Sequence, residues 1–418
     1  MAHTLAQKIL QKHTDQQVGE AGQIVRCRVS MALANDITAP LAIKSFRAMG
    51  AGKVFDKDRV ALVMDHFTPQ KDIDSAIQVK NTREFAAQMG ITHYYEGGEA
   101  GVEHALLPEL GLVGPGDIVV GADSHTCTYG GLGAFATGLG STDVAGAMAL
   151  GETWFKVPPS IRVSYRGTMP AHVGAKDLVL QLIGHIGVDG ALYKALEFDG
   201  PVVDAMSVEG RMTIANMAIE AGGKCGLFPS DDLTLAYTAA RGRNDEKLSA
   251  DQDAVYERSL SFDVSDLAPQ IACPHLPENV RPVTEVQGVQ IHQAVIGSCT
   301  NGRISDLREA AAVLRGRKVH KSVRCIVLPA TPGIWKQALR EGLIETFMDA
   351  GCIVGPATCG PCLGGHMGIL ADGERAIATT NRNFRGRMGS LESEVYLSNP
   401  SVAAASAVAG EIADPRGL

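Results

Sequence analysis

Short apolar runs recur along the chain, and each of them ends in polar or glycine-rich residues. Runs of this kind are typical of strands that are buried on both faces of a sheet, and we place them at residues 59–64, 117–121, 291–296, 323–328 and 376–380. Helical spacing of apolar residues separates the runs, at 5–13, 82–89, 175–186, 304–314 and 334–341. Buried strands that alternate with helices predict an α/β fold with largely parallel sheets.

The chain has 418 residues, which is too long for one ordinary core and predicts two or three domains. The proline-rich stretch 268–288 has no helical period and is interpreted as a linker, and a tail helix is expected at 402–413. We therefore expect domains at 1–130, 131–283 and 284–418, with the first boundary placed loosely within 125–165.

The net charge of −8 and the pI near 5.9 argue against nucleic acid or an anionic membrane as the main partner. The N-terminus does not have the pattern of a signal peptide, and no apolar stretch is long enough to span a bilayer. Nine cysteines in such a chain favour free thiols or metal ligands over disulfides, so we expect a reducing, cytoplasmic location.

Three cysteines near the C-terminus carry the strongest chemical signal. Cys299 lies in Gly-Ser-Cys-Thr-Asn, and Cys359 and Cys362 lie in Thr-Cys-Gly-Pro-Cys. Three thiolates can hold three corners of an iron–sulfur cube and leave the fourth iron open as a Lewis acid. A zinc site with His366 as a further ligand is the alternative. Cys127 and Cys273 stay unassigned, and the remaining cysteines are interpreted as small buried hydrophobes.

Acidic residues stand beside histidines where two predicted strands end. The pairs are Asp65-His66 and Asp123-Ser124-His125. A carboxylate can fix the tautomer of a histidine and raise its pKa, which suits a general acid for a leaving hydroxyl. His104 is a third candidate, although the sequence alone favours an ordinary histidine in a helix over residues 101–107.

Two further polar groups suggest substrate contacts. Asn216 and Glu220 are four residues apart and would share one face of a helix, as an ordinary surface pair also would. The segment 381–387, Asn-Arg-Asn-Phe-Arg-Gly-Arg, follows a strand, and its arginines suit carboxylates; the alternative is a solvated basic loop, which the buried-looking Phe384 disfavours. The spacing Gly131-x-Gly133-x-x-Ala136 imitates a dinucleotide fingerprint but stands too far behind its strand.

Taken together and in order, these motifs resemble the aconitase superfamily over essentially the whole chain. The resemblance implies three-layer α/β/α domains around a central [4Fe–4S] cluster bound by Cys299, Cys359 and Cys362, and favours iron–sulfur over zinc. It further implies roles for the other motifs. His66, paired with Asp65, would handle the substrate hydroxyl. The active-site partners around the cluster would be His104, Asp123 and His125, with Glu220 orienting His125 and Asn216 contributing polar contacts nearby. The polar and carboxylate-binding edge would be Asn381, Arg382 and Arg387.

The resemblance also implies a partner, because single-chain relatives take their serine base and another substrate arginine from a further C-terminal domain. After residue 390 this chain offers only a short tail, so we expect a separate small subunit to complete the site. The implied reaction is a reversible dehydration and rehydration of a small hydroxy-dicarboxylic acid. Isopropylmalate, on the route to leucine, is the expected substrate. Homocitrate or homoaconitate, 2,3-dimethylmalate, and a non-catalytic RNA-binding or iron-sensing role on the same fold are the alternatives.

Overall fold

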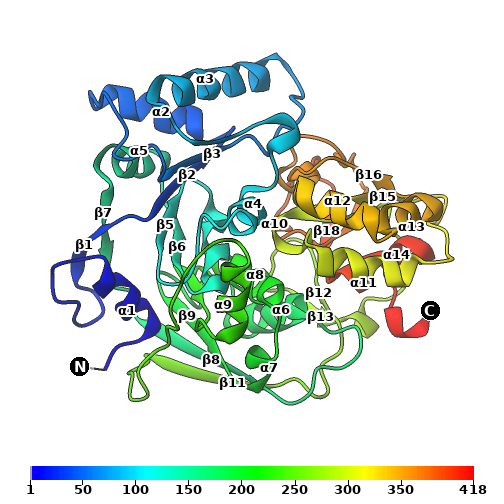
Figure 1. Ribbon diagram of the computed structural model, residues 1–418. Coiled ribbons are helices and arrows are strands. Elements are labelled where there is room, and N and C mark those ends of the chain that lie inside the picture. The colour runs from blue at the N-terminus through cyan, green and yellow to red at the C-terminus, as the bar shows by residue number, and fades with distance from the viewer. Residues whose placement is uncertain (1) are drawn as a thin grey trace.

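The computed structural model describes residues 2–418, which fold around three main sheets (Figure 1). The first sheet has five parallel strands, in the spatial order β4 (His93–Tyr95), β3 (Val60–Val63), β2 (Met31–Asn35), β5 (Ile118–Gly121) and β6 (Phe135–Gly138). A separate antiparallel ribbon pairs β1 (Ile24–Arg28) with β7 (Glu152–Lys156).

Alternating side chains of the five-stranded sheet enter two different cores. In β2, Ala32 and Ala34 pack on one face, whereas Met31 and Leu33 pack on the other. The first face is covered by α2 (Ala39–Ala48), α3 (Ile73–Met89) and α5 (Ser141–Leu150), and α1 (Leu5–Lys12) joins the same core. The second face is covered by α4 (Glu103–Glu109) and the 3₁₀ helix η2 (Ser124–Leu132). Sheet and helices thus form the three layers expected of an α/β domain.

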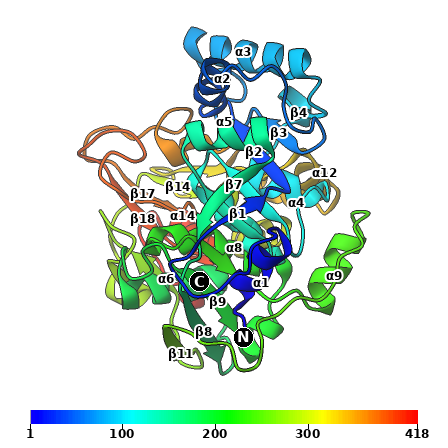
Figure 2. The ribbon, with the colours of Figure 1, turned by 90° about the vertical axis from the view of Figure 1, so that its left-hand side faces the viewer.

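The second sheet has four parallel strands and lies at the lower end of the molecule as Figure 2 shows it. Its spatial order is β10 (Cys225–Leu227), β9 (Ala195–Asp199), β8 (Ser160–Arg166) and β11 (Arg258–Asp263). The chain around it forms α6 (Ala175–Ile186), α7 (Pro201–Asp204), α8 (Val208–Asn216), the 3₁₀ turn η3 (Met217–Ala221) and α9 (Asp232–Ala239).

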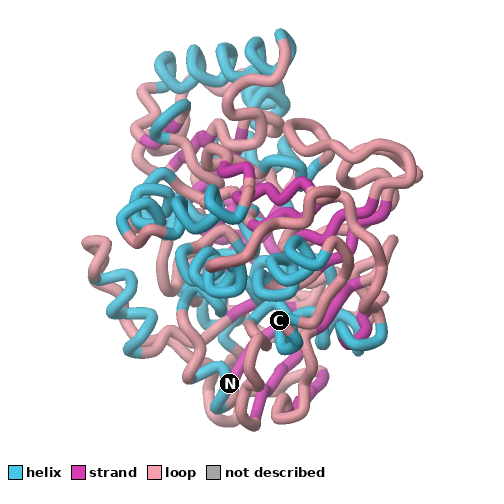
Figure 3. Tube along the Cα trace, turned by 90° about the vertical axis from the view of Figure 1, so that its right-hand side faces the viewer, coloured by secondary structure: helices cyan, strands magenta, loops and turns pink. Residues whose placement is uncertain are grey.

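The third sheet has seven strands, in the order β13 (Val280–Pro282), β12 (Gln270–Ala272), β18 (Glu394–Leu397), β17 (Arg375–Ala378), β14 (Gln293–Ile296), β15 (Arg324–Val327) and β16 (Ile353–Val354). All neighbours from β18 to β16 are parallel, whereas β12 and β13 run antiparallel at one edge. Helices flank this sheet on both faces. One core contains α6; the other contains α11 (Ile304–Leu314), α13 (Leu343–Ala350) and α14 (Pro400–Ala409). Figure 3 shows how helices, in cyan, surround the magenta strands of the molecule as a whole.

Several predicted elements differ from the observed ones. The stretch 268–288 is not a linker, because β12 is fully buried within it and pairs with β18. Pro282 is the last residue of β13, and the other prolines of the stretch lie outside the two strands. The tail helix begins earlier than predicted and ends at Ala409, because Gly410 takes the left-handed conformation at φ 83°. The domain limits at 130 and 283 stay predictions, and no helix within residues 2–418 is long and apolar enough to cross a membrane.

Glycines within and directly before the spacing that imitates a dinucleotide fingerprint serve close packing. A Cβ on Gly130 would lie 1.8 Å from the carbonyl oxygen of Gly226 in β10, and one on Gly131 would lie 2.5 Å from the amide nitrogen of Met212 in α8. These glycines therefore let η2, which carries His125, lie directly against α8 and β10.

Replacing Gly130 by alanine is expected to lower the free energy of unfolding by about 3 kcal/mol, since neither backbone can yield without moving η2. Urea or thermal unfolding would measure the change. Gly146→Ala in α5 is the matched control, because its added Cβ meets no atom within 4 Å and helix propensity favours alanine by about 1 kcal/mol. Equal stability of the two variants would contradict the packing role.

Candidate active site

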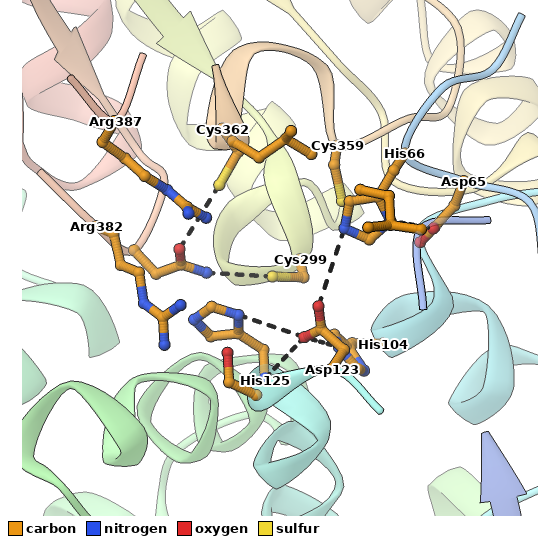
Figure 4. Close-up of a pocket in the computed structure, with 14 residues that line it drawn as sticks. Asp65, His66, His104, Asp123, His125, Cys299, Cys359, Cys362, Arg382 and Arg387 are labelled. Atoms are coloured by element: carbon orange, nitrogen blue, oxygen red, sulfur yellow. Dashed lines mark hydrogen bonds and ion pairs between the residues drawn. The ribbon is translucent and has the colours of Figure 1, made fainter. Parts of the chain in front are cut away.

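The carboxyl ends of the five-stranded and seven-stranded sheets border one cavity of about 180 Å³ (Figure 4). Asp65 and His66 follow β3, Asp123 follows β5, Cys299 follows β14, and Asn381 follows β17. Ligand sites in α/β proteins are commonly built at such strand ends. The residues that line the cavity are Ile37, Asp65, His66, His104, Asp123, Ser124, His125, Cys299, Cys359, Cys362, Leu363, Asn381, Arg382 and Arg387. Of the residues to which the resemblance gives a role in the site, Asn216 and Glu220 are not part of this lining.

The three cysteines reach the cavity from two turns. Cys299 lies in the short helix α10 (Ser298–Asn301), and Cys359 and Cys362 lie at the 3₁₀ turn η5 (Gly360–Leu363). All three are buried, with at most 7% of each residue exposed. The side-chain amides of Asn216 and Asn381 donate to Cys299 Sγ over 3.2 and 3.3 Å. Such donors stabilise negative charge on sulfur, which suits a thiolate that ligates a metal.

The spacing of the sulfurs argues against a single zinc ion. Within residues 2–418, two groups bring three potential ligand atoms within 4.8 Å of one another: Asp65, His66 and Cys359, and Glu103, His104 and Asp123. The three cysteines together form no such group, whereas two sulfurs on one zinc ion, each at about 2.3 Å, can be no farther apart than about 4.6 Å. His366, the suggested further zinc ligand, does not line the cavity. The donor set therefore fits a bulkier group such as an iron–sulfur cluster.

Burial disfavours the charged form of two of these thiols. Burial, reinforced by the nearby Cys362, raises the pKa of Cys299 to about 12. Burial likewise raises the pKa of Cys359 well above its ordinary value. Burial alone therefore favours the neutral thiol form of Cys299 and Cys359, and a bound metal cation would favour their thiolate form.

His66 is held by two carboxylates. Its Nδ1 donates to Asp65 Oδ1 over 2.6 Å, while its Nε2 lies 3.9 Å from Asp123 Oδ2 (Figure 4). Asp36 accepts from the backbone N–H groups of His66 and Phe67 over 3.0 and 2.7 Å, which fixes the turn after β3. Burial works to lower the pKa of His66, but a Cys359 thiolate, the form that a bound metal would favour, and Asp65 raise the pKa well above its usual value. The imidazolium form is thus favoured, with Nε2 turned to the cavity.

Asp123 organises the other two histidines. Its Oδ1 accepts from His104 Nε2 over 3.0 Å and from the backbone N–H of His125 over 2.8 Å. Burial works to raise the pKa of Asp123, but the hydrogen bonds with His104 and His125 hold it well below its ordinary value. His104 lies in α4 with Nδ1 3.1 Å from the hydroxyl of Tyr129, and burial lowers its pKa. His104 is therefore both a helix histidine and a cavity-lining one.

Glu220 links His125 to the arginine edge. Its Oε1 accepts from His125 Nε2 over 3.1 Å and from Arg382 Nε over 2.8 Å. The expected shared helix face of Asn216 and Glu220 is wrong in detail, because α8 ends at Asn216 and Glu220 lies in η3. Both side chains are nevertheless buried behind the cavity. Arg387 lines the cavity with its Nε buried and without a partner among residues 2–418, which leaves a donor for an anionic ligand.

The arginine segment is only partly a site. Asn383 turns away and donates to the carbonyl oxygens of Ala272 and Cys273. Phe384, expected to be buried, is 39% exposed, and Arg385 pairs with Glu392 at the surface. The buried side chains of this segment are thus asparagines with partners distant in sequence, whereas its aromatic ring lies outside.

Sequence reasoning missed several buried polar groups around the cavity. Asp36 follows β2 directly, so the strand-end pattern that found Asp65 and Asp123 would have found it too. Glu103 is buried beside His104, with Nε2 of the histidine 3.4 Å from Glu103 Oε1, and accepts from Asn35. Tyr129 donates to the carbonyl of Glu103. No local pattern marks these last two.

Comparisons with known proteins agree with this geometry. The sequence matches the family model of the Aconitase family (aconitate hydratase) over residues 7–288 and 281–410. It is 81% identical over 418 residues, 100% of both chains, to a protein of Nitratidesulfovibrio vulgaris (strain DSM 19637 / Miyazaki F) named 3-isopropylmalate dehydratase large subunit. Proteins with the same name from Desulfovibrio desulfuricans and Moorella thermoacetica are 71% and 60% identical, over 99% of each chain.

A solved structure shares the fold. The holo-form of Thermococcus kodakaraensis aconitase X matches 90% of this chain and 88% of its own, with a TM-score of 0.50 and 15% sequence identity. At that identity the likeness concerns the fold alone. The family match extends over nearly the whole chain, and the relatives match it end to end. The chain therefore belongs to the aconitase family.

Proposed function

We propose that this chain is the cluster-binding large subunit of a 3-isopropylmalate dehydratase, an iron–sulfur hydro-lyase that interconverts 2-isopropylmalate and 3-isopropylmalate on the route to leucine. The observation that carries the substrate is the 81% identity, over the full length of both chains, with a protein of that name. The cavity supports the reaction class, because it combines thiol ligands, histidine–carboxylate pairs and arginines.

Cys299, Cys359 and Cys362 would hold a [4Fe–4S] cluster, with no protein ligand for the fourth iron. When bound, the cluster supplies a Lewis acid for the substrate hydroxyl and a carboxylate. The Asn216 and Asn381 amides would orient toward the cluster sulfurs as they now do toward Cys299. The family implies the cluster, and the wide spacing of the three sulfurs supports this ligand set.

The remaining polar groups would place the substrate and handle protons. His66, with its tautomer fixed by Asp65, would hold a proton at Nε2 for the departing hydroxyl. Asp123 would keep His104 and His125 aligned around the same oxygen. Arg382, oriented by Glu220, and Arg387 would bind the two carboxylates of the substrate. The base that removes the carbon-bound proton would come from a small partner subunit, as the name of the relatives suggests.

Activity is expected only from the two-subunit complex. The large chain, reconstituted without oxygen, is expected to bind its cluster but to give no turnover alone, because it would lack the base. Mixing it with the small subunit should produce the absorbance of the unsaturated acid from 2-isopropylmalate. The small subunit alone is the control.

An assay with homocitrate, run in parallel, distinguishes the proposed substrate from the main alternative substrate. Turnover of homocitrate but not 2-isopropylmalate would overturn the proposed substrate. Turnover by the large chain alone, at the rate of the complex, would overturn the proposed partner. Localisation to the cytoplasm remains part of the proposal, in keeping with nine cysteines that are all unpaired in the structure.

A further inference from the structure

A buried lysine lies behind the cavity and has no place in the proposed reaction. Lys176 is the second residue of α6 and is 1% exposed. A lysine in the first turn opposes the helix dipole, and burying an ammonium group is costly unless it is paired and hydrogen-bonded. Local structure therefore gives no reason for a lysine here, and its partners must supply one.

Those partners are backbone groups at a strand end. Lys176 Nζ donates to the carbonyl oxygen of Thr379 over 2.9 Å and to that of Thr380. Both residues directly follow β17 and directly precede Asn381 and Arg382, which line the cavity. The ammonium group thus binds the last two backbone carbonyls before the cavity-lining residues Asn381 and Arg382.

The same strand end is tied to the loop of Cys299. The Thr379 hydroxyl accepts from the backbone N–H of Gly297 over 2.9 Å and donates to its carbonyl over 3.0 Å. Gly297 lies two residues before Cys299, and Asn381 Nδ2 contacts Cys299 Sγ. A movement of Thr379 and Thr380 would therefore change both the cysteine loop and the amide that donates to its sulfur.

The acidic groups that act on Lys176 include Glu220 and two of the proposed cluster ligands. Burial lowers the pKa of Lys176 to about 8, while the charges of Glu220, Cys299 and Cys362 oppose that shift. Thiolates that ligate a cluster would keep this amine protonated. It would then be a fixed, buried positive charge held at the strand end next to Asn381, within electrostatic reach of Cys299 and Cys362.

We propose that Lys176 is a positioning residue that clamps the Thr379–Thr380 strand end and holds a positive charge behind the cluster cysteines. It rests on the proposed function only in assuming that a cluster is bound. The clamp sets Asn381 and Arg382, and the charge raises the reduction potential of the cluster, because a nearby cation stabilises the more negative, reduced state. Lys176 itself touches neither substrate nor cluster in this account.

The test compares Lys176→Met, Lys176→Gln and Lys176→Arg in the reconstituted full chain, with Lys80→Met on the exposed face of α3 as the control. The readouts are iron and sulfide content and the cluster potential, followed by electron paramagnetic resonance without substrate. The Met and Gln variants should show a more negative potential than wild type, the Arg variant should return toward it, and Lys80→Met should not move it. If the Met variant fails to fold, the Gln and Arg variants make the same comparison.

The turnover of the two-subunit complex then tests the effect of Lys176 on the position of Asn381 and Arg382. With the small subunit, Lys176→Met should lower kcat about 10- to 100-fold, since misplacement of site groups by about 1 Å can cost that much. A fully loaded Lys176→Met chain with the wild-type potential would overturn the proposal, whatever its activity. If Lys176→Met shifts the cluster potential but the wild-type complex does not turn over 2-isopropylmalate, this inference stands and the proposed substrate is wrong. A wild-type chain that takes up no cluster would overturn both.

Discussion

Replacing Cys299 by serine is expected to abolish the dehydratase activity of the complex, by at least about 1,000-fold. A hydroxyl is a poor substitute for a thiolate on iron, and Cys299 is the sulfur toward which two asparagine amides point. Losing this corner would leave two cysteines in one turn, too few to keep an open iron facing the histidines. Lewis-acid assistance contributes several kcal/mol, and each 1.36 kcal/mol is tenfold in rate.

Iron, sulfide and kcat are the quantities to measure for Cys299→Ser. Cys27→Ala is the matched control, because Cys27 is equally buried but lies in β1, within the core beneath α1 and α5. The control should keep its cluster and most of its activity. A Cys299→Ser complex with wild-type iron content and turnover would show that this cysteine is not a ligand.

Replacing Asp123 by asparagine should lower kcat about 100- to 10,000-fold without loss of the cluster. The carboxylate accepts from His104 and from the backbone of His125, and it faces His66 across the cavity. An amide of the same shape removes the negative charge that these histidines surround, and it forces one of them into the wrong tautomer. General acid–base groups typically contribute rate factors of that size.

The comparison for Asp123→Asn is Asp15→Asn, at a side chain that is 94% exposed. Equal iron content in both variants, with turnover lost only in Asp123→Asn, is the expected pattern. A change confined to KM, with kcat intact, would assign Asp123 to substrate binding alone and refute the aligning role.

The sequence predicted the regular parts of the fold well where local periodicity decides the structure. The helices expected at 175–186 and 304–314 are α6 and α11, residue for residue. The helix expected at 82–89 is instead the end of α3, which begins at Ile73. Its first turns are rich in polar, exposed residues, and the Asp72–Ser75 capping box marks the start better than apolar spacing does. Strands β12 and β13 were missed because long-range pairing, not local pattern, makes them strands.

The site residues also fall into two groups, those predictable from local sequence and those that depend on distant partners. Motif residues at strand ends were predictable, because parallel strands bring their carboxyl ends to one edge and the family order of motifs reinforced the pattern. Asp36 stands directly after a strand, as Asp65 nearly does, and was overlooked. Glu103 and Lys176 could not be found in this way, since their importance comes from partners far along the chain, such as Thr379 for Lys176. Buried polar residues of this kind look like ordinary helix or turn residues until the packing is known.

Iron counting on the reconstituted chain would show whether three cysteines hold a four-iron cluster whose last iron is open. Iron and sulfide would be measured after anaerobic reconstitution, again after brief exposure to air, and again after addition of ferrous iron. We expect four irons and four sulfides per chain, selective loss of one iron in air, and its return with ferrous iron. A chain that binds zinc in preference to iron, or that loses all its iron and sulfide together, would contradict this assignment.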